Sequence, residues 1–479
     1  MGDILIRNVH HLATLSDTGE RLARVDILLR DGRIAAIGPD LQAELPAPRG
    51  VRRQVLRADT CLALPGLVNT HHHMYQTLQR NVPHVQNAKL FDWLVNLYEI
   101  WRFLDADAVY WSTLLGCAEL LLTGCTTTSD HHYVFPRTAP AELLDAQLEA
   151  AERIGIRFHT TRGSMSRGRS DGGLPPDAVV QDEQAILRDC ERVILRHHDP
   201  EPFAMRRVAL APCSPFSVTE TLLRDTVKLA RAHDVHCHTH LAETEDETAY
   251  CLQHYGRRPL QLMEELEWLG PDVWFAHGVH FEPQEIEVLA RTQTGVTHCP
   301  SSNMRLGSGI APVCEMLARG VPVGLGVDGS ASNDTSDMLG EVRQAMLLAR
   351  VQRGPDAMSA EGALRLATLG SARLLGRAEE IGSLEVGKAA DLVLVDLDRV
   401  DLAGALADPL AAVVFAGISH RVHTSIVNGE ILVRDGRLVR VDEALIARNA
   451  HVHSFRMLRQ AGLQLPFGTP GWLDVDGPG

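Results

Sequence analysis

The sequence predicts an α/β fold, namely a (β/α)8 TIM-type barrel accompanied by a small β-sandwich that is built from both termini. From Leu67 onward, short apolar runs alternate with segments of helical periodicity, and the runs number eight, which is the strand count of such a barrel. The two flanking pieces, residues 1–64 and 381–440, are rich in strand patterns. Neither piece is long enough for a core of its own, so we expect them to meet in one domain beside the barrel.

The flanking pieces contain turn signals as well as strand-like runs. In the first piece, Asp31-Gly32 separates two alternating stretches and predicts a tight hairpin, because such pairs favour turns in which both residues have positive φ. The last piece carries two similar pairs, Asn428-Gly429 and Asp435-Gly436. Residues 441–479 then follow as a C-terminal extension.

The central region, residues 65–380, is predicted to form the barrel. Its strands are expected to end near His73, His131, Thr161, Pro212, His240, His277, His298 and Asp328. Helical patterns lie between them, for example from Asp107 to Leu122 and from Val218 to His233. The chemistry of such barrels takes place at the carboxyl ends of the strands, so the polar side chains at these ends are the candidate functional groups.

The composition narrows the class of partner. Lys and Arg total 46 against 61 Asp and Glu, so the net charge is -15, and no basic tract is present that would follow a phosphate backbone. No apolar stretch is long enough to span a membrane, and the first residues lack the pattern of a signal peptide. We expect a cytoplasmic homo-oligomer that acts on a small molecule and binds neither nucleic acid nor membranes.

A histidine pair closes the first predicted barrel strand. Side chains of an extended strand repeat every two residues, so His71 and His73 point to the same face and can share one metal ion. One such pair is weak support, because many are surface histidines. Three further strand ends carry His240, His277 and Asp328, and this repetition favours a metal centre. The nine cysteines show no Cys-X-X-Cys spacing and fit reduced thiols.

Together these motifs resemble the amidohydrolase superfamily, in its branch of cytosine, guanine and triazine deaminases. The resemblance covers nearly the whole chain and rests on Pro65-Gly-Leu-Val-Asn-Thr-His-His-His73, His238-Thr-His-Leu-Ala-Glu-Thr244, Ala276-His277, His298-Cys-Pro-Ser-Ser-Asn303, Gly326-Val-Asp-Gly-Ser-Ala-Ser-Asn333 and Ile381-Gly-Ser-Leu-Glu-Val-Gly-Lys-Ala-Ala-Asp391. Within that branch, the bacterial 8-oxoguanine deaminases are most similar in Gln76, Arg162-Gly-Ser-Met-Ser166, Asp171-Gly-Gly-Leu-Pro-Pro176 and Ala211-Pro-Cys-Ser-Pro-Phe216.

The resemblance implies one divalent metal ion per chain with a position open for water. Its ligands would be His71, His73, His240 and Asp328. Zinc is the expected ion and iron an alternative, because this ligand set suits both. Dinuclear members of the superfamily bridge two ions with a barrel lysine, and no predicted barrel strand contains one. The alternative to a metal centre is a group of buried histidines satisfied by hydrogen bonds.

By the same resemblance, Glu243 would be the proton shuttle, which takes a proton from the attacking water, protonates a ring nitrogen and later helps ammonia to leave. A glutamate at this position could instead begin a helix. His277 and Asp328 would orient the water and stabilise the tetrahedral intermediate. The other nearby histidines are expected to support or pack, and for His131 and His132 lining the pocket is an equal alternative.

The expected substrate contacts are Gln76, Cys213 and Arg162. Gln76 can offer a donor and an acceptor to the lactam edge of a purine. Similar guanine deaminases place an arginine where this chain has Cys213. A small thiol there leaves room for the oxygen on C8 and can donate to it, unless it only packs in the core.

The predicted function is a metal-dependent aminohydrolase that converts 8-oxoguanine and water to urate and ammonia. Two alternatives remain within the same machinery, a triazine (hydroxyatrazine-type) and a guanine aminohydrolase. A third alternative is a structural relative of the fold without catalysis. Because the chain has every proposed ligand together with Glu243, the enzyme is favoured over the structural relative.

Overall fold

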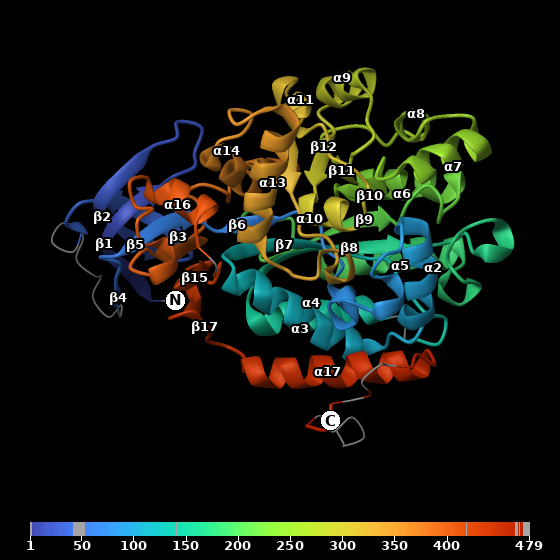
Figure 1. Ribbon diagram of the computed structural model, residues 1–479, viewed down its shortest axis with the longest axis horizontal. Coiled ribbons are helices and arrows are strands. Elements are labelled where there is room, and N and C mark those ends of the chain that lie inside the picture. Colours follow the sequence, from blue (N-terminus) through green and yellow to red (C-terminus); the bar gives the residue numbers. More distant parts are fainter. Residues whose placement is uncertain are drawn as a thin grey trace.

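The structure is a computed structural model that describes residues 2–41, 53–139, 142–417, 419–464, 468 and 470–472. Its barrel sheet has eight parallel strands that pair in chain order (Figure 1). They are β6 (Leu67–Asn69), β7 (Cys125–His132), β8 (Arg157–Ser164), β9 (Arg206–Pro212), β10 (Cys237–Leu241), β11 (Val273–His277), β12 (Gly295–His298) and β13 (Val323–Leu325). The Thr70 amide donates to the Leu325 carbonyl at 3.1 Å, which joins the first strand to the last. The predicted (β/α)8 barrel is confirmed.

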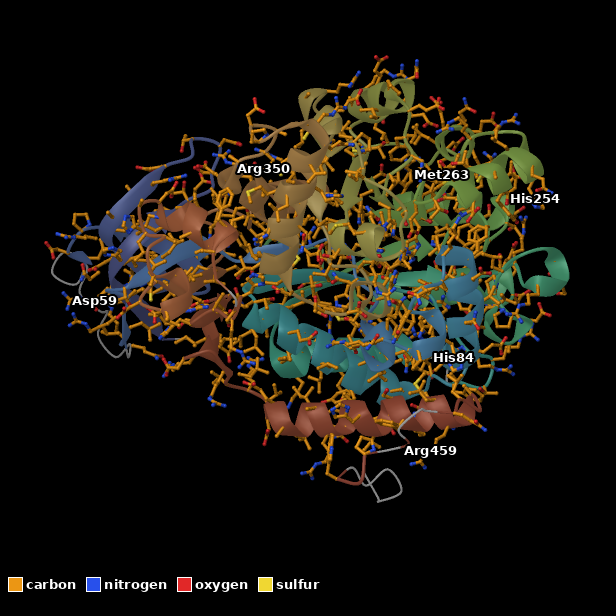
Figure 2. The ribbon with its side chains drawn as sticks, viewed as in Figure 1. Asp59, His84, His254, Met263, Arg350 and Arg459 are labelled. Carbon is orange, nitrogen blue, oxygen red and sulfur yellow. The ribbon has the colours of Figure 1, made fainter. Side chains whose placement is uncertain are left out.

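Helices follow the barrel strands along the chain and surround the sheet (Figure 1). They include α3 (Ala106–Leu122), α4 (Leu143–Ile154), α5 (Glu183–His197), α6 (Glu220–Ala232), α7 (Glu245–Tyr255), α8 (Pro259–Glu265), α9 (Pro283–Thr292), α10 (Pro300–Arg305), α11 (Val313–Ala318), α12 (Ser330–Asn333), α13 (Met338–Arg353), α14 (Ala360–Arg365) and α15 (Ser371–Leu374). The two helices predicted from periodicity begin after polar caps, Asp105 for α3 and Thr219 for α6. Side chains fill the space between helices and strands (Figure 2), and one large cluster of buried apolar residues forms the core there.

The two termini meet in one mixed sheet of nine strands. They are β1 (Asp3–Ala13), β2 (Arg21–Arg30), β3 (Arg33–Gly38), β4 (Arg53–Arg57), β5 (Cys61–Pro65), β14 (Leu392–Asp396), β15 (Thr424–Val427), β16 (Glu430–Arg434) and β17 (Arg437–Leu438). N-terminal β5 pairs antiparallel with C-terminal β14, and both terminal segments contribute to one core cluster. The expected hairpins form, and Asp31 and Gly32 both have positive φ, 50° and 74°.

The segment between β6 and α3 covers the carboxyl end of the barrel. It contains η1 (Met74–Gln79), η2 (Pro83–Val85) and α2 (Leu90–Trp101). A second apolar cluster unites Tyr75 of η1, Trp93 of α2 and Met457 of α17 (Glu443–Gln460). Figure 1 shows α17 lying along α3 on the outside of the barrel. Among the helices of the described ranges, none has both the length and the apolar character of a membrane span.

Candidate active site

Metal-binding atoms from three strand ends converge on one point. His71 and His73 lie just beyond β6, where the His71 carbonyl accepts the Asp328 amide at 3.0 Å. The Nε2 atoms of His73 and His240 are 3.0 Å apart. Asp328 Oδ1 lies 3.3 Å from His71 Nε2 and 3.2 Å from His73 Nε2. All four proposed ligands are therefore brought together at the carboxyl end of the barrel.

The Nδ1 atoms of the three proposed histidine ligands are already hydrogen-bonded to other groups. His73 Nδ1 lies 2.8 Å from the His131 carbonyl, and His240 Nδ1 lies 2.6 Å from the Cys213 carbonyl, so both must donate. His71 Nδ1 lies 2.8 Å from His238 Nε2, and His238 Nδ1 in turn donates to the Trp274 carbonyl. We infer that neutral rings keep their Nε2 lone pairs toward the common point.

This donor set fits a divalent cation. Burial lowers the pKa of His71 and of His240 well below the ordinary value, which favours neutral rings, while at His73 the Asp328 carboxylate outweighs burial and raises the pKa. His71 Nε2 is buried without a hydrogen-bond partner. Lone pairs and a carboxylate oxygen that face one another are unfavourable unless a cation lies between them. Imidazole and carboxylate ligands with outer hydrogen bonds to carbonyls are typical of zinc and of ferrous iron.

Two site residues have strained backbones. His277 has φ 75° and Asp328 φ 62°, in the left-handed region that non-glycine residues rarely adopt. Asp328 Oδ2 accepts hydrogen bonds from Ser302 Oγ at 2.5 Å and Ser332 Oγ at 3.2 Å, which turns Oδ1 toward the histidines. Burial opposes ionisation of Asp328, but the neighbouring His71 and His73 rings hold its pKa well below the ordinary value.

Glu243 and His277 face each other beside this cluster. Glu243 Oε2 lies 3.6 Å from His277 Nε2, and His277 Nε2 lies 4.0 Å from Asp328 Oδ2. Burial, reinforced by the charge of Asp328, raises the pKa of Glu243 to about 8. A carboxyl group with such a pKa can hold or release a proton near neutral pH, which is what proton transfer requires.

One cavity connects the cluster to the expected substrate contacts. It is lined by His73, Gln76, Leu90, Trp93, Leu94, Tyr133, Cys213, Phe216, His240, Glu243, His277, Leu306, Asp328 and Ser332. Gln76 and Trp93 line it, and their Oε1 and Nε1 atoms are buried without hydrogen-bond partners, which leaves one acceptor and one donor unused beside the cavity. Gly329 packs so closely against the Gln76 amide that any side chain at 329 would displace it.

Arg162 is not brought to this cavity. Its guanidinium donates to Asp189 of α5 at 2.7 Å and to Gln181 at 3.0 Å, and it lies over the Phe135 ring. A strand residue faces either the barrel interior or the surrounding helices, and Arg162 faces the helices. Its expected role as a substrate contact therefore finds no support in the structure.

The other histidines near the site occupy supporting positions. The His131 ring stacks on the His240 ring at 4.8 Å and 24°, and its Nε2 donates to the Ala211 carbonyl at 2.8 Å. One of its ring nitrogens also lies within 4.8 Å of those of His71, His73 and His240. His132 packs against Tyr75 and Phe135. His280 Nε2 is bound at 3.0 Å to the Ser308 carbonyl. None of these three histidines lines the cavity.

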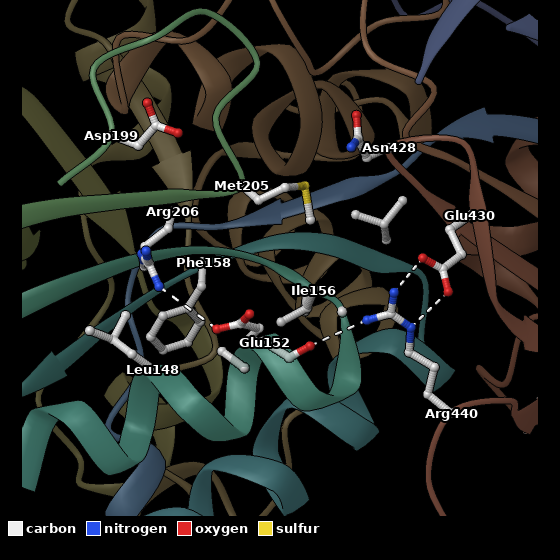
Figure 3. Close-up of a pocket in the computed structure, with 13 residues that line it drawn as sticks. Leu148, Glu152, Ile156, Phe158, Asp199, Met205, Arg206, Asn428, Glu430 and Arg440 are labelled. Carbon is white, nitrogen blue, oxygen red and sulfur yellow. Dashed lines mark hydrogen bonds and ion pairs between the residues drawn. The ribbon is translucent and has the colours of Figure 1, made fainter. Parts of the chain in front are cut away.

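A larger cleft of about 330 Å³ lies at the opposite end of the barrel, next to β15 and β16 (Figure 3). Its floor is apolar, and four of its charged side chains form two pairs, Arg440 with Glu430 at 2.7 Å and Arg206 with Glu152 at 3.8 Å. No histidine or cysteine is among its described lining residues. The chemistry therefore belongs to the smaller cavity around Glu243.

Three supporting residues were not singled out by the sequence analysis. Asn303 Oδ1 lies 3.0 Å from His277 Nδ1 and orients that ring. Asp130 accepts the Met74 amide at 2.6 Å, directly after ligand candidate His73. Glu247 binds the backbone at Glu243. Only Glu247 has a local signal, because Thr244-X-X-Glu247 is a helix-capping pattern. That pattern predicts a bond from Glu247 to the Thr244 amide, whereas Glu247 binds the amides of Ala242 and Glu243.

The protein is a (β/α)8 barrel with a histidine-rich candidate metal centre at the carboxyl ends of its strands. We call His71, His73, His240 and Asp328 the metal-directed groups. Residues 62–432 match the amidohydrolase family, and the chain belongs to that family. It is therefore a hydrolase, as predicted.

The chain is also similar along most of its length to individual members. It is 47% identical over 425 residues to 8-oxoguanine deaminase of Pseudomonas aeruginosa, which covers 88% of this chain and 93% of that protein. It is 39% identical over 459 residues to hydroxydechloroatrazine ethylaminohydrolase of Pseudomonas sp. strain ADP, covering 94% and 95%. The zinc-complexed crystal structure of atrazine chlorohydrolase TrzN from Arthrobacter aurescens TC1 superposes with a TM-score of 0.88 at 35% identity, over 94% of this chain and 100% of that chain.

Proposed function

We propose that the protein is a metal-dependent deaminase that converts 8-oxoguanine and water to urate and ammonia. The observation that carries this proposal is a single cavity that is lined both by the metal-directed groups with Glu243 and by Gln76 and Cys213. The 47% identity to an 8-oxoguanine deaminase supports the same substrate. The residues that line the cavity and the similarity to an 8-oxoguanine deaminase therefore support the same substrate, 8-oxoguanine.

The ion would be held by Nε2 of His71, His73 and His240 and by Oδ1 of Asp328. When bound, zinc, or alternatively iron, supplies Lewis-acid activation of a water molecule. The described barrel strands contain no lysine that could bridge a second ion. Metal analysis of the purified protein should find about one equivalent per chain, and His240→Ala should lose both metal and turnover. Two equivalents at full activity would contradict the single-ion proposal.

The side chains of the site would then transfer the two protons of the attacking water. Glu243 takes one proton and passes it to the ring nitrogen beside the reacting carbon. The second proton leaves with the amino group, so a C–N bond breaks, a carbonyl forms and ammonia is released. His277 and Asp328 would orient the attacking water. His277 Nε2 lies 3.6 Å from Glu243 Oε2 and 4.0 Å from Asp328 Oδ2, so the three side chains can contact the same water molecule.

Gln76 and Cys213 would select the purine. The Gln76 amide presents its unpartnered Oε1 to the lactam edge. Burial raises the pKa of Cys213 to about 12, so the thiol stays neutral and keeps its proton for a weak hydrogen bond to the oxygen on C8.

Ammonia release from a panel of 8-oxoguanine, guanine, isoxanthopterin and a hydroxylated aminotriazine tests the substrate. We expect kcat/KM for 8-oxoguanine to exceed that for guanine by more than about 10-fold, because a mismatched buried polar group costs about 1–3 kcal/mol. The triazine is the competing candidate, given the 39% identity to a triazine aminohydrolase. Equal turnover of both purines, or a preference for the triazine, would refute the proposed substrate.

A further inference from the structure

The turn between β10 and α7, which carries Glu243, is held by a second buried carboxylate. Ala242 has φ 54°, a left-handed conformation that alanine rarely adopts. Glu247, in the first turn of α7, is fully buried. Its Oε1 accepts the Ala242 amide at 3.0 Å, and its Oε2 accepts the Glu243 amide at 2.9 Å. Glu247 therefore fixes the peptide groups on both sides of Ala242.

The contact differs from ordinary helix capping. In a capping box, the glutamate at the third helical position binds the amide of the N-cap residue. Thr244 does cap α7 by accepting the Glu247 amide, but Glu247 reaches past Thr244 to the two preceding residues. The ordinary arrangement occurs elsewhere in the chain, where Glu285 of α9 accepts the amide of its own N-cap, Glu282, at 2.8 Å.

The carbonyls of the same turn are held from the opposite side. The Gly278 amide donates to the Leu241 carbonyl at 3.1 Å, and the His280 amide donates to the Ala242 carbonyl at 2.9 Å. Both donors belong to the segment that follows His277. The turn that carries Glu243 is therefore hydrogen-bonded to the segment that carries His277. Glu247 is absent from the described lining of that cavity. Glu247 therefore has no contact with a substrate in the cavity, and its hydrogen bonds to the Glu243 segment run through the turn.

We propose that Glu247 is a positioning residue that holds the Ala242–Glu243 turn in its left-handed conformation and so aims the Glu243 carboxylate into the cavity. This inference rests on the proton-transfer role proposed for Glu243. A carboxylate suits the task because it presents two acceptors to two converging N–H donors. A glutamine presents one acceptor and sets its NH2 group against the other donor.

Hydrogen exchange tests the placement without any substrate. In Glu247→Gln, the amides of Ala242 and Glu243 should exchange at least about 10-fold faster than in the wild type. Glu361→Gln is the control, because it changes a glutamate in the first turn of another helix, α14, whose partners Arg21 and Arg365 are not part of this turn, and it should leave these two amides unchanged. If the amide variant does not fold, Glu247→Asp keeps both oxygens on a shorter side chain and should show the same increase. Unchanged exchange in a folded variant would overturn the proposal.

Kinetics test the consequence. Glu247→Gln should lower kcat by about 10- to 100-fold with KM within about threefold and metal content unchanged, because small misplacements of a reacting group have effects of this size. The double variant Glu243→Gln/Glu247→Gln should be at most about threefold slower than Glu243→Gln alone. Losses that multiply would show that Glu247 does not act through Glu243. If the wild type turns over no member of the substrate panel, the proposed function fails, while the exchange measurement still decides the placement.

Discussion

At the scale of single residues, hydrogen bonds decide which atom of each side chain faces the cavity. The backbone carbonyl of Cys213 holds Nδ1 of His240, while the Cys213 side chain lines the substrate cavity. A substitution at position 213 therefore changes the pocket and keeps the bond that orients the metal ligand. At Glu243, by contrast, it is the side chain that faces the site, with its carboxylate 3.6 Å from His277 Nε2. Side-chain substitutions at these two positions separate substrate choice from proton transfer.

The proton-transfer role predicts a specific loss. Glu243→Gln keeps size and polarity but carries no transferable proton, so kcat should fall at least about 100-fold while metal content stays at the wild-type value. Steady-state kinetics and elemental analysis on the same preparation measure both quantities. A rate near that of the wild type would move the role elsewhere, with Asp328 as the first candidate.

The pocket residues predict a change in selectivity. Gln76→Ala should reduce kcat/KM for both 8-oxoguanine and guanine, because the lactam edge is common to the two purines. Cys213→Ala should mainly reduce kcat/KM for 8-oxoguanine, by a few-fold to about 10-fold, because only this purine has an oxygen on C8. Cys251→Ala, which removes a buried thiol outside the cavity, is the control. Equal losses for both purines in Cys213→Ala would assign the thiol to packing.

At the scale of elements, the alternation of short runs and helical segments predicted the barrel because most of its strands carry an apolar run, as β9 and β11 do, although β7 is largely polar. It did not place the strand ends exactly as observed: β6 ends at Asn69, and His71 and His73 continue beyond it, held by bonds to the neighbouring segments. The resemblance of the segment from Arg162 to Ser166 does not determine which side of β8 the Arg162 side chain takes, and Arg162, expected to contact the substrate, binds α5 instead. Asn303 and Asp130 act through contacts distant in sequence, which leave no local pattern.

Helix α2 forms a roof over the cavity and is expected to move. Leu90, Trp93 and Leu94 of α2 line a cavity of only about 30 Å³. This volume has room for one or two water molecules, whereas ligand pockets usually have about 300–1,000 Å³. A purine can enter only if the roof opens and then closes over it.

Hydrogen exchange of residues 90–101 measures this motion. We expect these amides to exchange faster than those of α9 in the free protein and to slow when 8-oxoguanine or urate binds, with α9 unaffected. Binding that leaves exchange in α2 unchanged would contradict a moving roof.

At the scale of the whole molecule, the barrel and the terminal β-domain are joined by a buried ion pair. Arg157 of β8 is fully buried, and its Nε donates to Asp391 Oδ2 at 2.8 Å and its Nη2 to Oδ1 at 3.0 Å. Asp391 Oδ1 also accepts the Asn428 amide at 2.6 Å, and its carbonyl accepts the Gly66 amide at 3.0 Å. Asp391 thus links the last segment of the chain to the start of the barrel, far from the metal-directed groups.

Removing one partner of this pair should destabilise the fold without changing the active site. Arg157→Met leaves the Asp391 carboxylate buried and uncompensated, which we expect to cost about 3–5 kcal/mol. The double variant Arg157→Met/Asp391→Leu removes both charges and should recover a large part of that loss, because an isolated buried charge is worse than an apolar pair. Arg231→Met breaks a partly exposed pair with Asp272 and should cost at most about 1 kcal/mol.

Thermal unfolding of the wild type and the three variants at one pH and salt concentration gives the comparison. Metal content measured below the transition should be equal in all four proteins. If Arg157→Met unfolds at the same temperature as Arg231→Met, the pair does not stabilise the junction between the two domains.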